Sequence, residues 1–260
     1  RTLDMIDPRH TLALVTGAGS GLGRALAIEL AHTGFKVVGF GRRNDALLET
    51  QSKIPEGRFI PKVVDVSDPH AVSVAFDQIR ADHGAVSLLI NNAGVYPRND
   101  IFDETGSSFM EVVAINLGGT VTCTLEVLKD MGTTGFGRII NVSSFADLAP
   151  LPASAAYSVS KGAGRMFGAA LHADLHDRFP EIIVNTWMPG MLATDMGIPD
   201  GLDPSVAAKW GVALALAHDP SLNGAIFEMD REVPAPRGLK RKIKDAVLLR
   251  RPPPPRILKI

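Results

Sequence analysis

Seven short runs of apolar, largely β-branched residues recur along the chain, and longer stretches with helical spacing separate them. The apolar runs are TLALVT (11–16), KVVGF (36–40), FIPKVV (59–64), VSLLI (86–90), GRIINV (137–142), IIVNTW (182–187) and GAIFEM (224–229). The helical stretches cover 21–33, 68–82, 107–130, 155–178 and 203–218. Strands that are almost continuously apolar are buried on both faces, and their alternation with helices is typical of a parallel sheet. We therefore expect a single-domain α/β fold over 11–230, a doubly wound parallel sheet of seven strands with helices on both faces.

The last thirty residues differ in composition from this α/β pattern. Residues 231–260 hold ten Lys or Arg residues against Glu232 and Asp245, and they include the run PPPP, which favours an extended segment. We interpret 1–10 as a lead-in and 231–260 as a basic, proline-rich tail. A solvated tail, a tail packed on a sister subunit and attachment to an anionic membrane surface are all consistent with this composition. Nucleic-acid binding is disfavoured because the tail has no aromatic residues to stack on bases.

Part of the tail has the spacing of a short amphipathic helix. Leu239, Ile243 and Val247 recur at every fourth position in GLKRKIKDAVLLRR.

Composition and cysteine content limit the chemistry. The chain has 260 residues, of which 45% are hydrophobic and 21% charged, as in an ordinary globular protein. Its single cysteine, Cys123, can form no intrachain disulfide and supports no thiolate metal site, so we expect no metal. A lone cysteine suits a reducing cytoplasm. The first ten residues contain no apolar core of the kind a secretion signal needs. The apolar strands are too short to span a bilayer. We therefore expect a cytoplasmic protein.

The first apolar run leads directly into TGAGSGLGRALAIEL, residues 16–30. Glycines at 17, 21 and 23 let the backbone turn tightly and approach a ligand that a Cβ atom would obstruct. The helix that follows directs its free amides and positive dipole end toward that ligand, which suits a pyrophosphate. The spacing Gly17-x-x-x-Gly21-x-Gly23 departs from the standard G-x-G-x-x-G, and the alternative is a plain tight connection. Its place after the first strand of an alternating pattern favours a Rossmann-type dinucleotide site.

The second strand ends in GFGRRND, where an NAD site would carry a carboxylate for the ribose 2′-hydroxyl. Gly41 leaves room, and Arg42 and Arg43 supply planar donors suited to a 2′-phosphate. The alternative is a pair of solvated arginines at the start of a surface helix. The residues favour NADP, with NAD possible.

Residues AAYSVSKGAG, 155–164, place Tyr157 and Lys161 one helical turn apart, on the same face. A free phenol titrates at about 10, too high for a base at neutral pH. A nearby ammonium would lower that pKa toward a working range. An isolated pair of this kind would more often be an exposed amphipathic pair.

The pair is not isolated, and here the sequence resembles the short-chain dehydrogenase/reductase family. The matching segments occur in the family's order: TGAGSGLG (16–23), Asp65-Val66, NNAG (91–94), Asn116 in VVAINLGG, NVSS (141–144), YSVSK (157–161) and PGMLAT (189–194). Each motif alone is modestly specific, whereas the ordered combination is very specific.

The resemblance implies a catalytic tetrad of Asn116, Ser144, Tyr157 and Lys161. Tyr157 would be the general acid/base, Lys161 would lower its pKa and hold the nicotinamide ribose, and Ser144 would hydrogen-bond the substrate oxygen, with Ser143 as the neighbouring alternative. Asn116 would hold a helix distortion and a water in a proton relay; the alternative is a buried asparagine satisfied by backbone. The implied cofactor contacts are Gly17, Ser20, Gly21, Leu22, Gly23, Arg42, Arg43, Asp65, Val66, Asn92, Ala93, Gly94, Tyr157, Lys161, Pro189, Gly190, Leu192 and Thr194.

The family's activity implies an oxidoreductase that transfers a hydride between NADP(H) and a carbonyl or secondary alcohol. The alternative is a nucleotide-sensing or scaffold protein with the same fold and little turnover. The resemblance also implies a homodimer or homotetramer, joined through the helices at 107–130 and 155–178. Residues 95–100, 145–154 and 195–205 are expected to line the substrate pocket, and the sequence does not identify the substrate.

Overall fold

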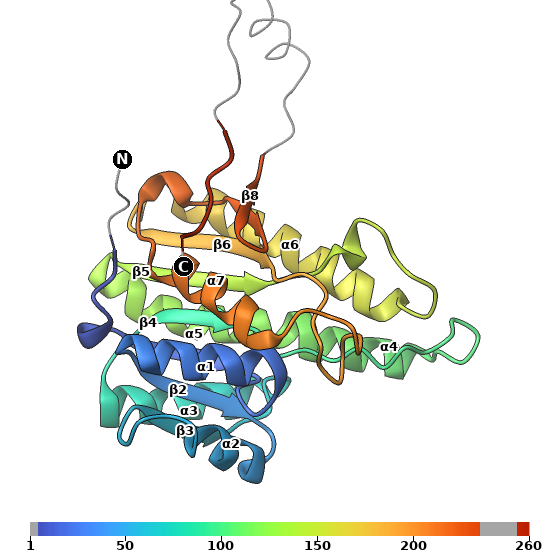
Figure 1. Ribbon diagram of the computed structural model, residues 1–260, viewed down its shortest axis with the longest axis horizontal. Coiled ribbons are helices and arrows are strands. Elements are labelled where there is room, and N and C mark those ends of the chain that lie inside the picture. Colours follow the sequence, from blue (N-terminus) through green and yellow to red (C-terminus); the bar gives the residue numbers. More distant parts are fainter. Residues whose placement is uncertain (1–4, 235–253, 260) are drawn as a thin grey trace, which may run out of the picture.

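The structure, a computed structural model, describes residues 5–234 and 254–259, and its centre is one twisted sheet (Figure 1). The first seven strands match the predicted apolar runs within about two residues. The strands are β1 (Leu12–Thr16), β2 (Lys36–Gly41), β3 (Phe59–Val63), β4 (Val86–Asn91), β5 (Gly137–Val142), β6 (Ile182–Met188), β7 (Ile226–Glu228) and β8 (Arg231–Val233).

Seven α-helices are found in the described residues, and several of them have a capping residue at the N-terminus or a glycine that ends the helix. Asp68 and Asp203 cap α3 and α7 with proline in the first turn, and Gly34 and Gly135 end α1 and α5 with positive φ angles of 114° and 72°. The helices are α1 (Gly21–Thr33), α2 (Asn44–Gln51), α3 (Pro69–His83), α4 (Gly106–Val113), α5 (Gly119–Thr134), α6 (Ala155–Leu175) and α7 (Pro204–Leu216).

The strand order is β3-β2-β1-β4-β5-β6-β7-β8, which confirms the doubly wound arrangement. The order reverses between β1 and β4, so the connections at their carboxyl ends diverge and leave a crevice there. All pairings are parallel except the last, because β8 runs antiparallel to β7. The expectation of seven strands was therefore short by one: β8 is a charged three-residue segment, REV, without the apolar pattern that indicated the other strands.

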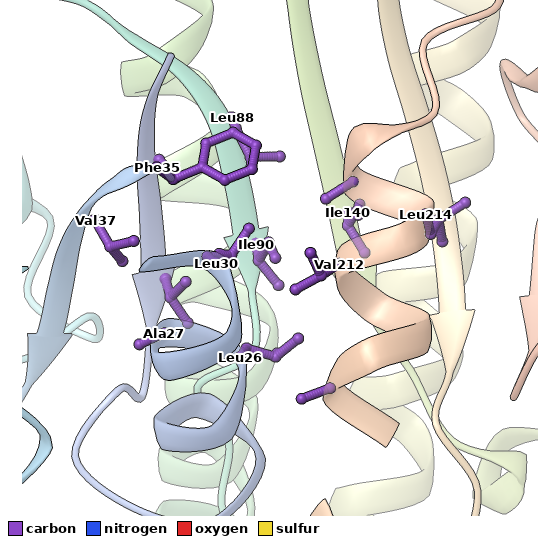
Figure 2. Close-up of a cluster of buried hydrophobic side chains, with 14 of the residues drawn as sticks. Leu26, Ala27, Leu30, Phe35, Val37, Leu88, Ile90, Ile140, Val212 and Leu214 are labelled. Carbon is purple, nitrogen blue, oxygen red and sulfur yellow. The ribbon is translucent and has the colours of Figure 1, made fainter. Parts of the chain in front are cut away.

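Two hydrophobic cores cover the two faces of the sheet. One lies under α1 and α7, where Leu26 and Val212 meet over Ile90 of β4 and Ile140 of β5 (Figure 2). The other lies under α3, α5 and the end of α6, with Phe76 and Val127 among its buried side chains. Each inner strand is therefore buried on both sides, which explains why its sequence is apolar without alternation.

The segment 254–259, near the end of the chain, packs against the β7–β8 hairpin. Ile257 pairs with Arg231 of β8 in an antiparallel bridge, and the amide of Leu258 donates to the Asp230 carbonyl over 2.7 Å. Arg256 forms a two-armed ion pair with Glu232, at 2.7 and 2.8 Å, and Leu258 is buried in the first core. Both ends of the predicted tail thus contact the body of the protein. The amphipathic helix predicted around Leu239, Ile243 and Val247 lies outside the described residues.

The helical run Gly106–Thr134 is long and apolar enough to cross a membrane, by length and composition alone. The core helix of a globular domain meets the same criterion, and α5 within this run packs along β4. Between α4 and α5 the run contains one π-helical segment, Ala114–Gly118.

Arg138 of β5 is fully buried and ties three elements together. Its five N–H groups donate to the carbonyls of Ala217, Leu214, Ile183 and Ile139 and to the side chain of Asn185. Two of these acceptors lie at the C-terminal end of α7, where carbonyl groups have no partner within the helix. Burial lowers the pKa of Arg138 to about 9. The guanidinium therefore acts as an internal cap that joins α7 to β5 and β6.

We expect Arg138→Met to lower the free energy of unfolding by about 2–4 kcal/mol, because it leaves several buried carbonyls without donors. Urea unfolding would measure this, with Arg178→Met, at an exposed arginine, as the matched control expected to change stability by less than about 0.5 kcal/mol. Equal unfolding midpoints for the two variants would contradict the capping role.

We expect Leu258→Ala to cost about 2–3 kcal/mol of stability, because the side chain fills the first core. Ile257→Ala is the matched control, since its side chain is 54% exposed. Thermal unfolding of the full chain compares the two, and an equal loss in both would show that segment 254–259 adds nothing to the core.

Candidate functional site

A cleft of about 1280 Å³ lies at the carboxyl ends of β1, β2, β4, β5 and β6. Its walls are the segments that follow these strands, and they bring together motifs that lie far apart in the sequence. All of the predicted site residues line this cleft except Asn116, which lies one layer behind it beside the lining residue Ile115.

The glycine-rich turn after β1 leaves no space for side chains. A Cβ atom on Gly23 would overlap the carbonyl oxygen of Gly17 and lie 2.6 Å from Nδ2 of Asn92. Gly17 and Gly21 have positive φ angles, 69° and 50°, a conformation that favours glycine. Ser20, the N-cap of α1, makes no side-chain hydrogen bond to the first-turn amides, which border the cleft.

The end of β4 is fastened to the end of β1. The amides of Asn92 and Ala93 both donate to Oγ1 of Thr16 over 2.9 Å, and the Asn92 side chain donates to the Thr16 carbonyl over 3.0 Å. These bonds hold the NNAG segment as one wall of the cleft. Thr16 was not among the predicted site residues, because its role depends on a strand 76 residues away.

Positive charge lines the cleft at the end of β2. Arg42 and Arg43 are exposed, and Arg43 precedes α2 without capping it. Asp65 lies near them: hydrogen bonds from Ser67 lower its pKa, and the charge of Arg42 contributes in the same direction. The arginines are thus free to meet an anionic ligand.

The catalytic candidates meet at the other end of the cleft. Ser144 lies near enough to the Tyr157 phenol to lower its pKa, whereas the buried hydroxyl of Ser143 has no hydrogen-bond partner among the described residues. This contact favours Ser144 over Ser143 as the serine that acts beside Tyr157. Lys161 is buried, with Nζ 5.7 Å from the centre of the Tyr157 ring and donating to the Val142 carbonyl over 3.1 Å.

The expected lowering of the Tyr157 pKa by Lys161 is wrong for this structure. Burial is the largest influence and raises the pKa of Tyr157, outweighing the hydrogen bond from Ser144, while the charges of Tyr96 and Asp147 act in the same direction as burial. Burial also lowers the pKa of Lys161 to about 8, so the group still carries its proton at neutral pH but loses it more readily than a free lysine. The reason is that both groups are largely buried, which disfavours charge on either.

Asn116 lies within the π-helical segment, as expected of a residue that holds a helix distortion. Its amide group accepts from the Val95 amide over 2.8 Å, and donates to the Val95 carbonyl and to Ser160, each over 3.0 Å. These bonds connect the loop after β4 with α6, one residue before Lys161. The alternative of a buried, satisfied asparagine therefore describes its side chain well.

An ion pair supports the Ser144 segment from behind. Arg165, one turn beyond Lys161 on α6, forms a two-armed pair with Asp147, whose side chain is 4% exposed. Arg165 also donates to the Ser144 carbonyl over 3.4 Å. Neither residue was predicted as part of the site, since the pairing joins a helix to a loop 18 positions away.

The two tyrosines of the chain stack on each other. The rings of Tyr96 and Tyr157 are 15° from parallel, with centres 4.5 Å apart. The guanidinium of Arg98 lies 5.1 Å from the centre of the Tyr96 ring, and donates to the carbonyls of Met196 and Gly197 over 2.9 and 2.8 Å. Residues 95–100 were expected to line the pocket, but the stack was not predicted. Its one sequence signal is that Tyr96, the other of the chain's two tyrosines, lies two positions after the NNAG motif.

The loop after β6 closes the cleft on the side of the glycine turn. Its predicted contacts, Pro189, Gly190, Leu192 and Thr194, all line the cleft, and Thr194 lies close to Gly21. Main-chain bonds between Leu202 and residues 191 and 193 hold the loop in place.

These residues fit a nicotinamide dinucleotide. The glycine turn has no side chains above it, the first turn of α1 presents amides to the cleft, and two cations stand at the end of β2. The donor set suits phosphates at one end, and the tyrosine, serine and lysine suit proton transfer at the other. Among the described residues no group of three or more His, Cys, Asp or Glu side chains is placed to hold a metal.

Comparison with known proteins identifies the family of the chain. The family model described as short chain dehydrogenase matches residues 11–203. The chain is 37% identical over 191 residues to "Probable oxidoreductase EphD" of Mycobacterium tuberculosis, a match that covers 72% of this chain and 32% of that protein. It is 34% identical over 190 residues to an acetoacetyl-CoA reductase of Cupriavidus necator, covering 71% and 76% of the two chains.

A match to a "Probable NADP-dependent dehydrogenase" of Haemophilus influenzae is 36% identical over 173 residues and covers 64% of this chain and 66% of that one. Among solved structures, that of a "putative gluconate dehydrogenase" from Agrobacterium tumefaciens superposes with a TM-score of 0.80 at 26% identity, covering 86% and 96% of the chains. The chain thus spans about a third of the length of EphD and most of the length of the reductase and of the solved structure. With the family model, the doubly wound fold and the ordered motifs in agreement, the chain belongs to the short-chain dehydrogenase/reductase family of oxidoreductases.

Proposed function

We propose that the protein is an NADP(H)-dependent oxidoreductase that interconverts a carbonyl group and a secondary alcohol, with Tyr157 as its general acid/base. The observation that carries this proposal is the grouping of Ser144, Tyr157 and the buried Lys161 at one end of a glycine-lined cleft, with Nζ of Lys161 5.7 Å from the centre of the Tyr157 ring. Bound NADPH would supply a hydride to the carbonyl carbon.

The residues of this chain supply the proton and the orientation. The carbonyl oxygen of the substrate would accept hydrogen bonds from the hydroxyls of Ser144 and Tyr157, which polarises the bond and aligns the carbon. Because burial raises the pKa of Tyr157, the phenol holds its proton at neutral pH and can give it to the oxygen as charge develops there. This protonation state favours reduction of the carbonyl, and oxidation of an alcohol would need the phenolate.

Lys161 would hold the nicotinamide ribose, as the family resemblance implies. Among the described residues its Nζ has one hydrogen-bond partner, the Val142 carbonyl, and an ammonium has three donors, so two remain for ribose hydroxyls and solvent. Gly94 lies opposite: a Cβ atom there would come within 3.7 Å of Nζ. The water relay through Asn116 stays a prediction.

The choice of NADP over NAD rests on the arginines at the end of β2. A 2′-phosphate is a dianion that planar guanidinium groups bind with two parallel hydrogen bonds. Arg42 and Arg43 border the cleft and are exposed, and the chain has no carboxylate at positions 41–44 to accept from a free 2′-hydroxyl.

Self-association as a homodimer or homotetramer is part of the same proposal. Large apolar side chains are exposed on the helices expected to form the interface, including Met110 on α4, Leu125 on α5 and Met166 on α6, which are 56–69% exposed. Such side chains gain most from being covered by a second copy.

We expect Tyr157→Phe to lower kcat with a ketone substrate by at least about 1000-fold, because the phenol hydroxyl is the proposed proton donor. The Kd for NADPH should change by less than about threefold, since the ring and Lys161 remain. Stopped-flow NADPH oxidation and fluorescence titration measure the two. A variant with near-normal turnover would exclude the acid/base role, and a wild-type protein that binds NADPH but reduces no carbonyl would support the nucleotide-sensing alternative.

Replacing Arg42 and Arg43 by alanine should weaken NADPH binding about 10- to 100-fold and leave NADH binding nearly unchanged, because each lost contact is a charge-assisted hydrogen bond. The matched control is Arg178→Ala, an exposed arginine outside the cleft. Isothermal titration with both nucleotides gives the ratio. The preference for NADP is refuted if both nucleotides lose affinity equally.

A further inference from the structure

The substrate end of the cleft, beyond Ser144 and Tyr157, is largely apolar. Its lining includes Tyr96, Leu151, Met191, Met196 and Ile198. Two methionines, Met191 and Met196, are exposed in this lining, at 60% and 37%. Leu151 is 61% exposed, so the cleft presents apolar surface that a ligand of the same character would cover.

Few charged side chains line this part of the cleft. Nη2 of Arg98 donates to two main-chain carbonyls of the opposite loop, at Met196 and Gly197, and the guanidinium lies over the Tyr96 ring. Asp195 is exposed and would repel an anionic substrate. A polyhydroxylated compound would lose many hydrogen bonds to water on entering and find fewer replacements among the apolar side chains.

Arg98 sets the position of Tyr96. Its φ angle is 56°, in the left-handed region that non-glycine residues rarely adopt, and such conformations persist where the surroundings enforce them. Here the enforcing contacts are the two hydrogen bonds across to the loop after β6. Arg98 therefore joins two walls of the cleft and holds the Tyr96 ring flat against Tyr157.

We infer, on the basis of the proposed function, that the site takes apolar carbonyl compounds that carry a flat ring beside the carbonyl, and that Tyr96, positioned by Arg98, is the specificity-determining residue. A carbonyl oxygen bound by Ser144 and Tyr157 places its substituent next to the stacked Tyr96 ring and the methionines. Because Tyr157 and Arg98 already lie against the Tyr96 ring, a substrate ring would meet its edge, and aromatic rings also pack favourably edge to face. Thioether side chains adapt their shape to a flat ring and contact ring edges favourably.

A set of ketones of similar size separates this inference from its alternatives: 1-phenylethanone, 1-cyclohexylethanone, 2-octanone and 5-ketogluconate. With wild-type protein and NADPH, kcat/KM should be highest for the phenyl ketone and at least about 100-fold lower for the polyhydroxylated acid. The cyclohexyl ketone, with the same carbon framework but no flat face, should be about 10-fold less efficient than the phenyl ketone.

Variants of Tyr96 assign the preference to that ring. Tyr96→Phe keeps the ring and should retain the ratio of phenyl to cyclohexyl ketone, whereas Tyr96→Ala should abolish it, mainly through a higher KM for the phenyl ketone. Arg98→Met should reduce the ratio in the same way. The Kd for NADPH serves as the control in every variant and should stay within about threefold, since the ring lies at the substrate end.

The possible outcomes can be told apart. Higher efficiency with 5-ketogluconate or 2-octanone than with the phenyl ketone overturns the inference and leaves the proposed function intact. A ratio unchanged in Tyr96→Ala overturns the role of Tyr96. No NADPH oxidation with any ketone, while NADPH still binds, overturns the proposed function, and the inference with it.

Discussion

The nucleotide end of the cleft depends on one steric constraint: β1, the first turn of α1 and the end of β4 approach so closely that position 23 has no room for a side chain. A Cβ atom at Gly23 would overlap the Gly17 carbonyl, and Asn92 fills the remaining space while it hydrogen-bonds Thr16. Because the sheet order reverses at this point, the close approach opens a crevice floored by main chain. Main-chain amides that have no partner within the helix suit the phosphates of a nucleotide. Selectivity among substrates therefore depends on the other end of the cleft.

The substrate end is built differently, from side chains that hold one another in place. Asn116 in the π-helical segment joins the Val95 backbone to Ser160, and Lys161 reaches back to the Val142 carbonyl. The ion pair of Asp147 and Arg165 holds the Ser144 segment against α6. The three groups proposed for chemistry therefore sit on supports that are themselves hydrogen-bonded, the condition for keeping reacting atoms aligned.

Burial has opposite effects on the two ionisable groups proposed for chemistry, raising the pKa of Tyr157 and lowering that of Lys161 to about 8. Both shifts have one main cause, the cost of holding charge on a buried group. The stacked Tyr96 ring covers part of Tyr157 and contributes to its burial. The features that fit an apolar substrate and the protonated state of Tyr157 thus arise from the same environment.

Local pattern by itself determined the first seven strands, the main helices and the glycine turn, because burial on both faces requires apolar runs and a tight turn requires glycine. The order of motifs also identified the residues that line the cleft. The tertiary structure alone decided the rest: β8, whose charged sequence pairs only because β7 and residues 254–259 lie beside it, the stack of Tyr96 on Tyr157, and the direction of the Tyr157 pKa shift. Each of these depends on contacts between distant segments and on how much water they exclude, and neither quantity is encoded in the spacing of neighbouring residues.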